Sequence, residues 1–302
     1  MPKLGSKKKF YMVKNKEKNY INHSPVEFNL LIQQLRGFFM SKNFIETFPQ
    51  HELSILAACE DPKTVRSFEF TNSIWPLPQT NQMHLERILM QNADNIDGLF
   101  CLTASYRDEP NPIPGRHLRS FQMWEAERKG DFANLLQTLS ELMVHLKLIS
   151  KVEDIPFFTY NQLCEHYNTD ILESEHELKM WEEFGDVVGI THFTKRTSPF
   201  FNMKFAGYDE KTGEEMYNKC DLIICGQETF GSAERSCDVN AMRKNFYTIS
   251  NGEYSKLLFE KFGKYRVEKE LEEFLTFNMI ERWGFGSGVS RLMRAMKIKN
   301  LI

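Results

Sequence analysis

Two arginines, a histidine and an aromatic residue stand close together in the segments SYRDE and RSFQMWEAE and in the proline-rich loop between them. Arg107 offers a planar guanidinium that suits bidentate contact with a phosphate. Arg116 and His117 in the loop would reach the outer phosphates of a nucleotide, and Phe121 could stack on a purine. A surface hairpin crossed by ion pairs explains the pattern equally well, so these residues alone leave both interpretations open.

A glycine-rich run, GFGSGVSR, opens the last predicted helix and ends in Arg291. Glycines such as Gly288 let a backbone approach a ligand closely, and the N-terminus of a helix binds phosphate groups. Many glycine runs only connect two elements, which is the alternative. A cation in the first turn of a helix is unfavourable unless it meets an anion, so Arg291 favours a phosphate site.

Charged residues recur at intervals of seven in DLIICGQETFGSAER, as Asp221, Glu228 and Arg235. Two carboxylates on neighbouring strands would hold Mg²⁺ through oxygen ligands, and Arg235 would recognise a polar side chain or a carboxylate. Without further support, scattered charges at strand ends are the simpler interpretation. The polar run QTNQMHLE would line an amino-acid pocket or simply begin a helix, and the sequence alone does not decide between them.

Hydrophobic spacing predicts the elements that would position these residues. Apolar residues at three- and four-residue steps indicate an amphipathic helix at 25–43, and a short strand closed by proline follows at 44–49. Further strands are predicted at 99–107, 119–127, 199–205 and 217–225, and further helices at 132–152, 171–184, 266–274 and from Ser287 onward. Because these elements show no regular βαβ rhythm, we expect an α+β fold around a mainly antiparallel sheet.

Composition limits the class of protein. The chain has 302 residues, a hydrophobic fraction of 41% and a net charge of −3, which is typical of a soluble globular protein and not of one whose whole surface binds nucleic acid. Six cysteines form no CxxC pair, and no apolar run approaches the roughly 18 residues of a membrane span. We therefore expect a cytoplasmic protein with reduced thiols and with neither DNA nor a membrane as partner.

The distribution of lysine residues separates a short N-terminal segment from the rest of the chain. Residues 1–24 form a lysine-rich segment that we expect to be a basic, flexible tail, with contact to RNA as the alternative. Residues 25–302 are expected to form one catalytic domain. Within it, the charge-rich stretch 153–195 is expected to be a connecting insertion and not a separate domain.

Taken together, these motifs resemble the catalytic core of class II aminoacyl-tRNA synthetases of the asparaginyl and aspartyl branch, over residues 25–302. The unit at 28–49 resembles motif 1, the dimer-forming element; SYRDE…RHLRSFQMWEAE resembles motif 2 of asparaginyl-tRNA synthetases; GFGSGVSRL resembles motif 3. The archaeal-type asparagine synthetase is a related enzyme. The resemblance implies a mainly antiparallel six-stranded sheet flanked by helices, and a homodimer.

The resemblance also implies roles for individual residues. Those implied to bind ATP are Arg107, Glu109, Arg116, His117, Phe121, Asp221, Glu228, Gly288 and Arg291. Asp221 and Glu228 would hold Mg²⁺, and Arg107, Glu228 and Arg291 would serve catalysis. Those implied to bind the amino-acid substrate are Glu60, Thr80, Gln82, Glu86, Glu125 and Arg235. Catalysis in such a site is mostly electrostatic, because cations stabilise the charge that develops on the α-phosphate.

Leu85 and Glu86 bear on the choice of substrate. Aspartyl enzymes and archaeal-type asparagine synthetases carry a lysine where this chain has Leu85, whereas QMHLE resembles the QLHLE of asparaginyl enzymes. Glu86 and Arg235 together would recognise an amide through one acceptor and one donor, and Glu86 would repel a carboxylate. An asparagine-like side chain is therefore favoured over aspartate, although SCD after Arg235 replaces the acidic pair that is usual in the family.

Asparaginyl-tRNA synthetases also carry an N-terminal oligonucleotide-binding barrel that grips the anticodon, whereas only about 24 residues precede motif 1 here. This favours an AMP- and pyrophosphate-forming ligase that activates a free or peptide-borne asparagine- or aspartate-type substrate. The acceptor would be ammonia or an amine, as in asparagine synthetase, and not tRNA. A minimal asparaginyl-tRNA synthetase that charges tRNA is the first alternative, and a non-catalytic paralogue acting as a binding or regulatory subunit is the second.

Overall fold

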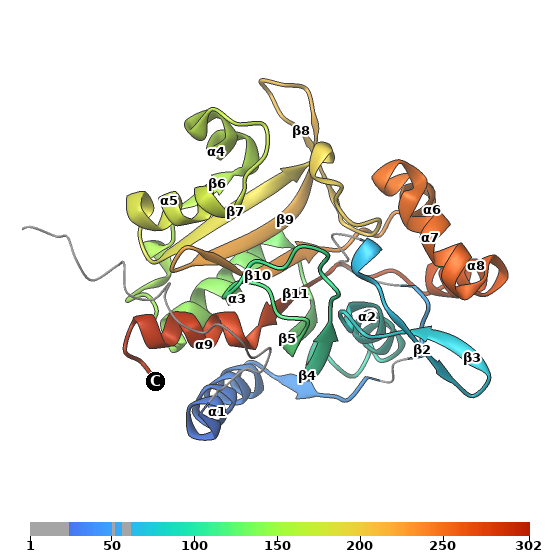
Figure 1. Cartoon of the computed structure of the whole chain (residues 1–302), viewed down its shortest axis with the longest axis horizontal. Helices are drawn as coiled ribbons and strands as arrows, with labels where there is room; N and C mark the ends of the chain where they lie inside the picture. The colour runs from blue at the N-terminus through green and yellow to red at the C-terminus, as the bar shows by residue number, and fades with distance from the viewer. Residues whose placement is uncertain (1–23, 50–51, 56–61) are drawn as a thin grey trace, which may run out of the picture.

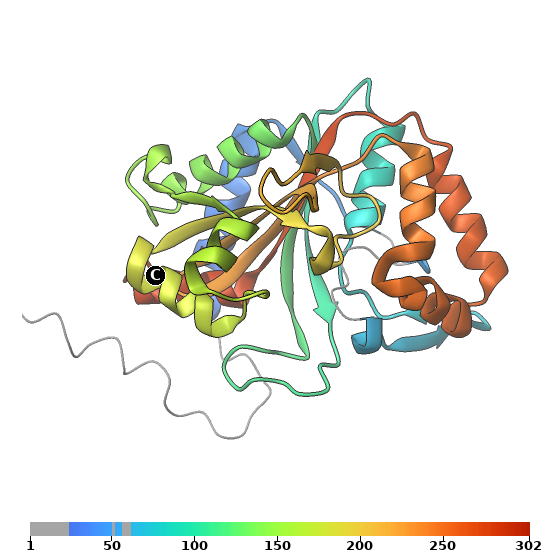
Figure 2. The same cartoon turned by 90° about the horizontal axis from the view of Figure 1, so that it is seen from above.

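The computed structural model describes residues 24–49, 52–55 and 62–302. Apart from Ser24, the tail expected at 1–24 lies outside these residues, and so does Glu60. Within the described part, a large central sheet carries helices on both faces (Figure 1 and Figure 2), which confirms the predicted α+β class. No helix in this part is long and apolar enough to cross a membrane.

In the described part of the chain, nine strands form the central sheet, in the spatial order β1-β4-β5-β11-β10-β9-β7-β6, with β8 paired to β9 beside this path. The pairs β1–β4 and β6–β7 are parallel, and the other pairs are antiparallel. The bounds are β1 (Phe44–Glu46), β4 (Gly98–Tyr106), β5 (Ser120–Lys129), β6 (Phe157–Thr159), β7 (Val187–Thr194), β8 (Phe205–Tyr208), β9 (Glu215–Ile224), β10 (Gln227–Glu234) and β11 (Arg282–Gly288).

The prediction of a mainly antiparallel sheet is confirmed, but its expected size of six strands is wrong. The sequence presents β11 as a glycine-rich turn, because every second position of this strand lacks a side chain. β10 follows β9 after a tight turn in which Cys225 and Gly226 both have positive φ, and its small residues conceal the alternation of a strand. Residues 153–195 contribute β6 and β7 to the sheet, and the strand expected at 199–205 begins only at Phe205.

Helices α1 (Pro25–Ser41), α3 (Phe132–His145) and α9 (Val289–Ile298) enclose the main hydrophobic core against one face of the sheet. α1 begins where the Ser24 hydroxyl accepts a hydrogen bond from a backbone amide in the first turn. Phe39 of α1 lies in the core, with ring-centroid distances between 5.1 and 5.7 Å to Phe44, Phe100, Trp124 and Phe285. This packing holds β4, β5 and β11, three of the strands that carry the site.

The opposite face of the sheet is covered only at its sides. On one side α2 (Gln82–Gln91) packs Leu85 and Leu89 against Leu99 and Cys101 of β4. Beyond it, the hairpin of β2 (Ser67–Phe70) and β3 (Ser73–Pro76) lies beside α6 (Val239–Thr248), α7 (Glu253–Phe262) and α8 (Lys264–Leu275) (Figure 1). On the other side α4 (Tyr160–Tyr167) and α5 (Ser174–Phe184) pack near β7. A cavity lies between the two sides, over β5, β11, β10 and β9.

Candidate functional site

The floor of this cavity is formed in part by Gly231 and Gly286, and the next row of the sheet on the same face carries at most a methyl group. Gly231 of β10 pairs with Gly286 of β11, and Ala233 pairs with Gly284 in the next row on the same face. A Cβ atom at Gly284 would lie 1.9 Å from a carboxylate oxygen of Glu127, which no side chain tolerates. The glycines therefore leave a trough across the middle of the sheet, and neighbouring side chains fold over it.

Charged residues of the two flanking strands form the walls of the trough. The register places Glu125 and Glu127 of β5 opposite the glycines of β11, in the same two rows. On the other side it places Asp221 and Lys219 of β9 opposite Gly231 and the neighbouring alanine of β10. Since residues two apart on a strand share a face, the period of the sheet is what brings these four charges to the face of the sheet on which the cavity lies.

One end of the trough is cationic and aromatic. The Arg107 guanidinium lies 5.7 Å from the ring centroid of Phe121, and both line the cavity with Arg291 and Gly288. Arg291 donates a hydrogen bond from Nη1 to the backbone carbonyl of Glu228 at 2.7 Å. The buried Nε of Arg107 has no hydrogen-bond partner within the described residues. A buried donor of this kind costs free energy unless a ligand accepts from it, which marks this end as an anion site.

Further cations surround His117 at the same end. Burial and the positive charges of Arg291, Arg116 and Arg107 lower the pKa of His117, while Glu109 opposes this effect. His117 is therefore neutral at pH 7 and accepts a hydrogen bond at Nδ1 from the Ile113 amide, at 3.3 Å. The group of three guanidiniums suits a polyphosphate.

Arg116 is held by α5, which the sequence does not connect with the site. Its guanidinium donates a hydrogen bond to the Glu177 carboxylate, and the two side chains are only 17% and 12% exposed. The other Glu177 oxygen accepts from the Glu228 amide at 2.7 Å. Arg116 does not line the cavity in this arrangement, so contact with a nucleotide would require it to leave Glu177.

The predicted Mg²⁺ ligands, Asp221 and Glu228, lie near one another, and Asp221 already has a cationic partner. A Cβ atom at Gly231 would lie 3.6 Å from one oxygen of each, so the two carboxylates approach one another. However, Oδ2 of Asp221 accepts a hydrogen bond from the Lys219 ammonium at 2.6 Å, and Asp221 does not line the cavity. Glu228 and Lys219 do line it. A divalent ion held by both carboxylates would therefore have to displace the Lys219 ammonium from Asp221.

Glu125 and its partners form the next part of the wall. Its carboxylate accepts hydrogen bonds from the Thr80 hydroxyl and, at 3.0 Å, from the Asn81 amide. Burial nevertheless raises the pKa of Glu125 above its ordinary value. Thr80, Gln82 and Glu125 all line the cavity. A ligand ammonium would offset the cost of burying this charge, so this wall suits an amino group.

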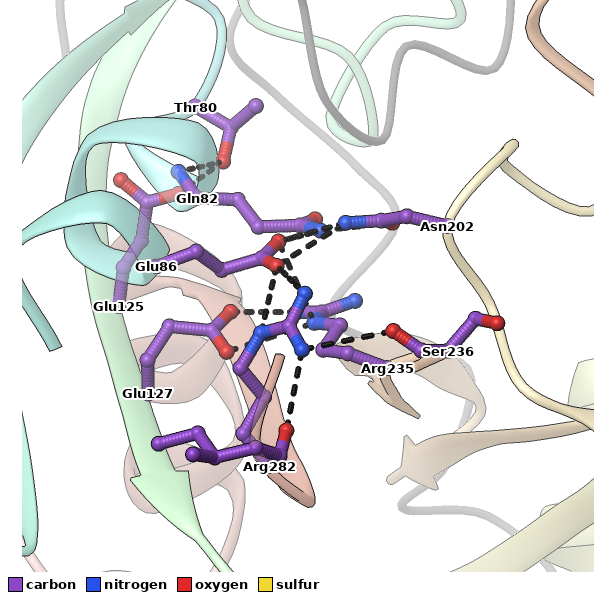
Figure 3. A network of polar contacts seen from close by, with 10 residues as sticks. Thr80, Gln82, Glu86, Glu125, Glu127, Asn202, Arg235, Ser236 and Arg282 are labelled. Carbon is purple, nitrogen blue, oxygen red and sulfur yellow. Dashed lines mark hydrogen bonds and ion pairs between the residues drawn. The ribbon is translucent and has the colours of Figure 1, made fainter. Parts of the chain in front are cut away.

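Four charged residues lie at the far end of the trough in a buried network (Figure 3). The Glu86 carboxylate accepts hydrogen bonds from Arg282 at 2.6 and 2.9 Å, from Gln82 at 2.7 Å and from Asn202 at 2.8 Å. Burial opposes its ionisation, but Arg282 and Arg235 hold the pKa of Glu86 below its ordinary value. Glu86 is 0% exposed and does not line the cavity. This placement differs from the expectation that it contacts the substrate.

Arg235 and Glu127 are the members of the network that reach the cavity. Arg235 donates from Nη2 to Glu127 at 2.6 Å, and its Nε lies 3.7 Å from Glu86. Burial raises the pKa of Glu127 to about 7, although the Arg235 charge opposes the shift. Two carboxylates thus balance two guanidiniums, and the floor is neutral when Glu127 is ionised.

The structure brings most of the predicted site residues to one place. Those that line the cavity are Thr80, Gln82, Arg107, Phe121, Glu125, Glu228, Arg235, Gly288 and Arg291, and those that do not line it are Glu86, Glu109, Arg116, His117 and Asp221. The roles of Glu127, Glu177, Asn202, Lys219 and Arg282 were not predicted from the sequence. Two signals were present: Arg282 stands two residues before Gly284, the first glycine of the run, and Lys219 stands two residues before Asp221.

Replacement of Arg282 by methionine should destabilise the protein by about 3–5 kcal/mol, because it leaves Glu86 buried and unpaired. The double variant Arg282→Met/Glu86→Gln should recover a large part of this loss, since the uncompensated charge is gone. Urea denaturation measures both. Arg243→Met, which breaks an exposed ion pair with Glu272, is the matched control and should cost far less stability than Arg282→Met. Equal losses for the single and double variants would contradict this account of the network.

Comparisons with known proteins agree with this geometry. The family model of class II tRNA synthetases (D, K and N) matches residues 11–302. Asparaginyl-tRNA synthetase from Pyrococcus horikoshii, complexed with asparaginyl-adenylate, has a similar fold, with a TM-score of 0.70 and 18% identity over 89% of this chain and 64% of that chain. The asparaginyl-tRNA synthetase of Entamoeba histolytica, also in complex with asparaginyl-adenylate, has a similar fold as well. Its TM-score is 0.69, and its sequence is 17% identical over 92% of this chain and 65% of that chain.

The aspartyl-tRNA synthetase of Entamoeba histolytica is also similar, with a TM-score of 0.63 and 17% identity over 89% of this chain and 54% of that chain. The chain thus spans less than two thirds of the length of these structures, and the low identities establish likeness of fold alone. No curated protein sequence matches the chain. The family match covers nearly its whole length, and the chain therefore belongs to the class II tRNA synthetases of the D, K and N group.

Proposed function

We propose that the chain is an ATP-dependent ligase that joins the carboxylate of an asparagine- or aspartate-type amino acid to AMP and releases pyrophosphate. The observation that carries this proposal is a single continuous cavity with Glu125 and Arg235 towards one end and Arg107, Phe121 and Arg291 towards the other. An amino acid and a nucleotide would lie end to end in it. Asparaginyl-adenylate, bound in two structures of similar fold, is a molecule of this shape.

In the chemical step, an oxygen of the substrate carboxylate attacks the α-phosphorus of ATP. A new P–O bond forms while the bond to pyrophosphate breaks, and negative charge develops on the α-phosphate. Arg107 lies where it would stabilise that charge, and its Nε donor has no competing partner in the described residues. Phe121 and Arg291 would enclose the adenine. No side chain needs to act as a covalent nucleophile.

The substrate side chain would meet the charge-balanced end of the trough. Arg235 would donate to it, and Glu127 would accept from it, so the amide of asparagine finds a partner for its oxygen and for its nitrogen. Glu86 would act on the substrate only through Gln82 and Arg235, which it holds in place. A carboxylate side chain would bring an unbalanced charge to this floor while Glu127 is ionised, and asparagine is therefore favoured over aspartate.

The acceptor of the acyl group is proposed to be ammonia or an amine, which would attack the acyl carbon and release AMP. The small negative net charge of −3 supports a small acceptor over a nucleic acid. The first alternative is a minimal asparaginyl-tRNA synthetase that charges tRNA, and the second alternative is a paralogue that binds ATP without catalysis. The presence of Arg107, Glu228 and Arg291 together at the cavity argues against the non-catalytic paralogue.

A homodimer is also proposed. Large apolar side chains of α1 and of the strand segment after it are exposed: Val26, Leu30, Met40, Ile45 and Phe48. Such a group on one surface is typical of a protein interface.

Sedimentation at micromolar concentration should show a dimer, and Leu30→Glu/Phe48→Glu should shift it to a monomer. A wild-type monomer would refute the proposal.

Amino-acid-dependent exchange of labelled pyrophosphate into ATP tests the proposed activity. Asparagine should support exchange, and added ammonium should produce AMP together with an acylated amine. Arg107→Ala should lower the exchange rate by about 10²–10³-fold, whereas Arg119→Ala, an exposed arginine of the same hairpin, should change it less than twofold. Aminoacylation of tRNA without any reaction with amines would favour the alternative. ATP binding without exchange for either amino acid would favour the non-catalytic paralogue.

The raised pKa of Glu127 predicts a pH-dependent choice between the two amino acids. Below about pH 7 Glu127 is protonated, the floor carries an extra positive charge, and aspartate binds better. Above about pH 7 Glu127 is ionised and repels the second carboxylate. The ratio of kcat/KM for aspartate to that for asparagine, measured by exchange, should therefore fall between pH 6 and 8. In Glu127→Gln this ratio should be higher and independent of pH, and an unchanged pH profile would contradict the role of Glu127.

A further inference from the structure

We propose that the ammonium of Lys219 takes the place of a divalent cation at Asp221, so that Glu228 is the one carboxylate of this wall that contacts a metal ion bound with ATP. The proposal rests on the proposed function, because it concerns the metal that accompanies the nucleotide. The sequence predicts instead that both Asp221 and Glu228 hold the metal ion.

Lys219 and Asp221 stand two residues apart on β9 and point to the same face, and the Nζ–Oδ2 distance is 2.6 Å. The side chains are 19% and 8% exposed, so this is a largely buried ion pair and not a surface contact. In such surroundings a second cation at Asp221 would meet a strong repulsion from the ammonium.

Of this ion pair, Lys219 lines the cavity and Asp221 does not. A ligand in the trough would therefore meet the ammonium first, with the carboxylate behind it. Glu228, on the neighbouring strand, lines the cavity and is 28% exposed.

The Lys219 ammonium also lies against an aromatic ring. Its Nζ lies 3.8 Å from the ring centroid of Phe193, a residue of β7 that is only 6% exposed. The aromatic face and the carboxylate together hold the cation in one position. Lys219 thus supplies a fixed positive charge to the wall of the trough, in the row that holds Glu127 on the opposite wall.

Binding of Mn²⁺ in the presence of a non-hydrolysable ATP analogue tests this proposal by electron paramagnetic resonance and calorimetry, without any turnover. Lys219→Met keeps much of the apolar stem over Phe193 but removes the charge. It should bind Mn²⁺ at least about tenfold more tightly than the wild type, because Asp221 becomes available. Asp221→Asn should change the wild-type affinity less than about twofold, and Lys219→Met/Asp221→Asn should lose the gain.

Two further variants complete the design. Glu228→Gln should weaken Mn²⁺ binding by about tenfold or more. Lys204→Met removes another lysine from a buried carboxylate, that of Glu234, at a place that does not line the cavity, and it should have no effect. A loss of Mn²⁺ affinity in Asp221→Asn, or no gain in Lys219→Met, would overturn the proposal. If Lys219→Met fails to fold, the Asp221→Asn result alone decides. Failure of the wild type to bind the ATP analogue would instead refute the proposed function.

Discussion

The site depends on a steric constraint: two adjacent strands in the middle of the sheet carry almost no side chains on one face. Gly231, Ala233, Gly284 and Gly286 leave space that Glu127 and its neighbours fold across, and a single methyl group at Gly284 would collide with that carboxylate. The aromatic core on the opposite face keeps the strands in register. The space of the cavity therefore exists because these positions lack side chains, and the neighbouring strands of the sheet supply the charged residues along its walls.

The site also depends on three buried ion pairs. Arg282 neutralises Glu86 beneath the trough, Arg235 is paired with Glu127 on its surface, and Lys219 is paired with Asp221 on the opposite wall. Each pair is costly to bury and far more costly to break. The pairs fix where positive and negative charge face the cavity, and this pattern supports the choice of a neutral, amide-bearing side chain.

Local motifs predicted much of this arrangement, because residues of one hairpin or one helix start keep their relation in the fold. The cationic end with Arg107, Phe121 and Arg291 came from such motifs. The partners of Glu86 did not, since Arg282 and Asn202 lie 196 and 116 residues away along the chain. Likewise, hydrophobic periodicity did not reveal the strand β11, because a period of two is recognised from side chains at alternate positions. In β11 the alternate positions 284, 286 and 288 are glycines, and the site requires them to be without side chains.

The most direct test of a cavity that holds an amino acid and a nucleotide together is the affinity of a stable mimic of the joined molecule. Calorimetry would compare 5′-O-(N-asparaginyl)sulfamoyl-adenosine with AMP and with asparagine alone. The account predicts that the joined molecule binds at least about 10²-fold more tightly than either part, and that Arg107→Ala removes most of this gain. Affinity no greater than that of AMP would show that the trough does not bind both parts at once.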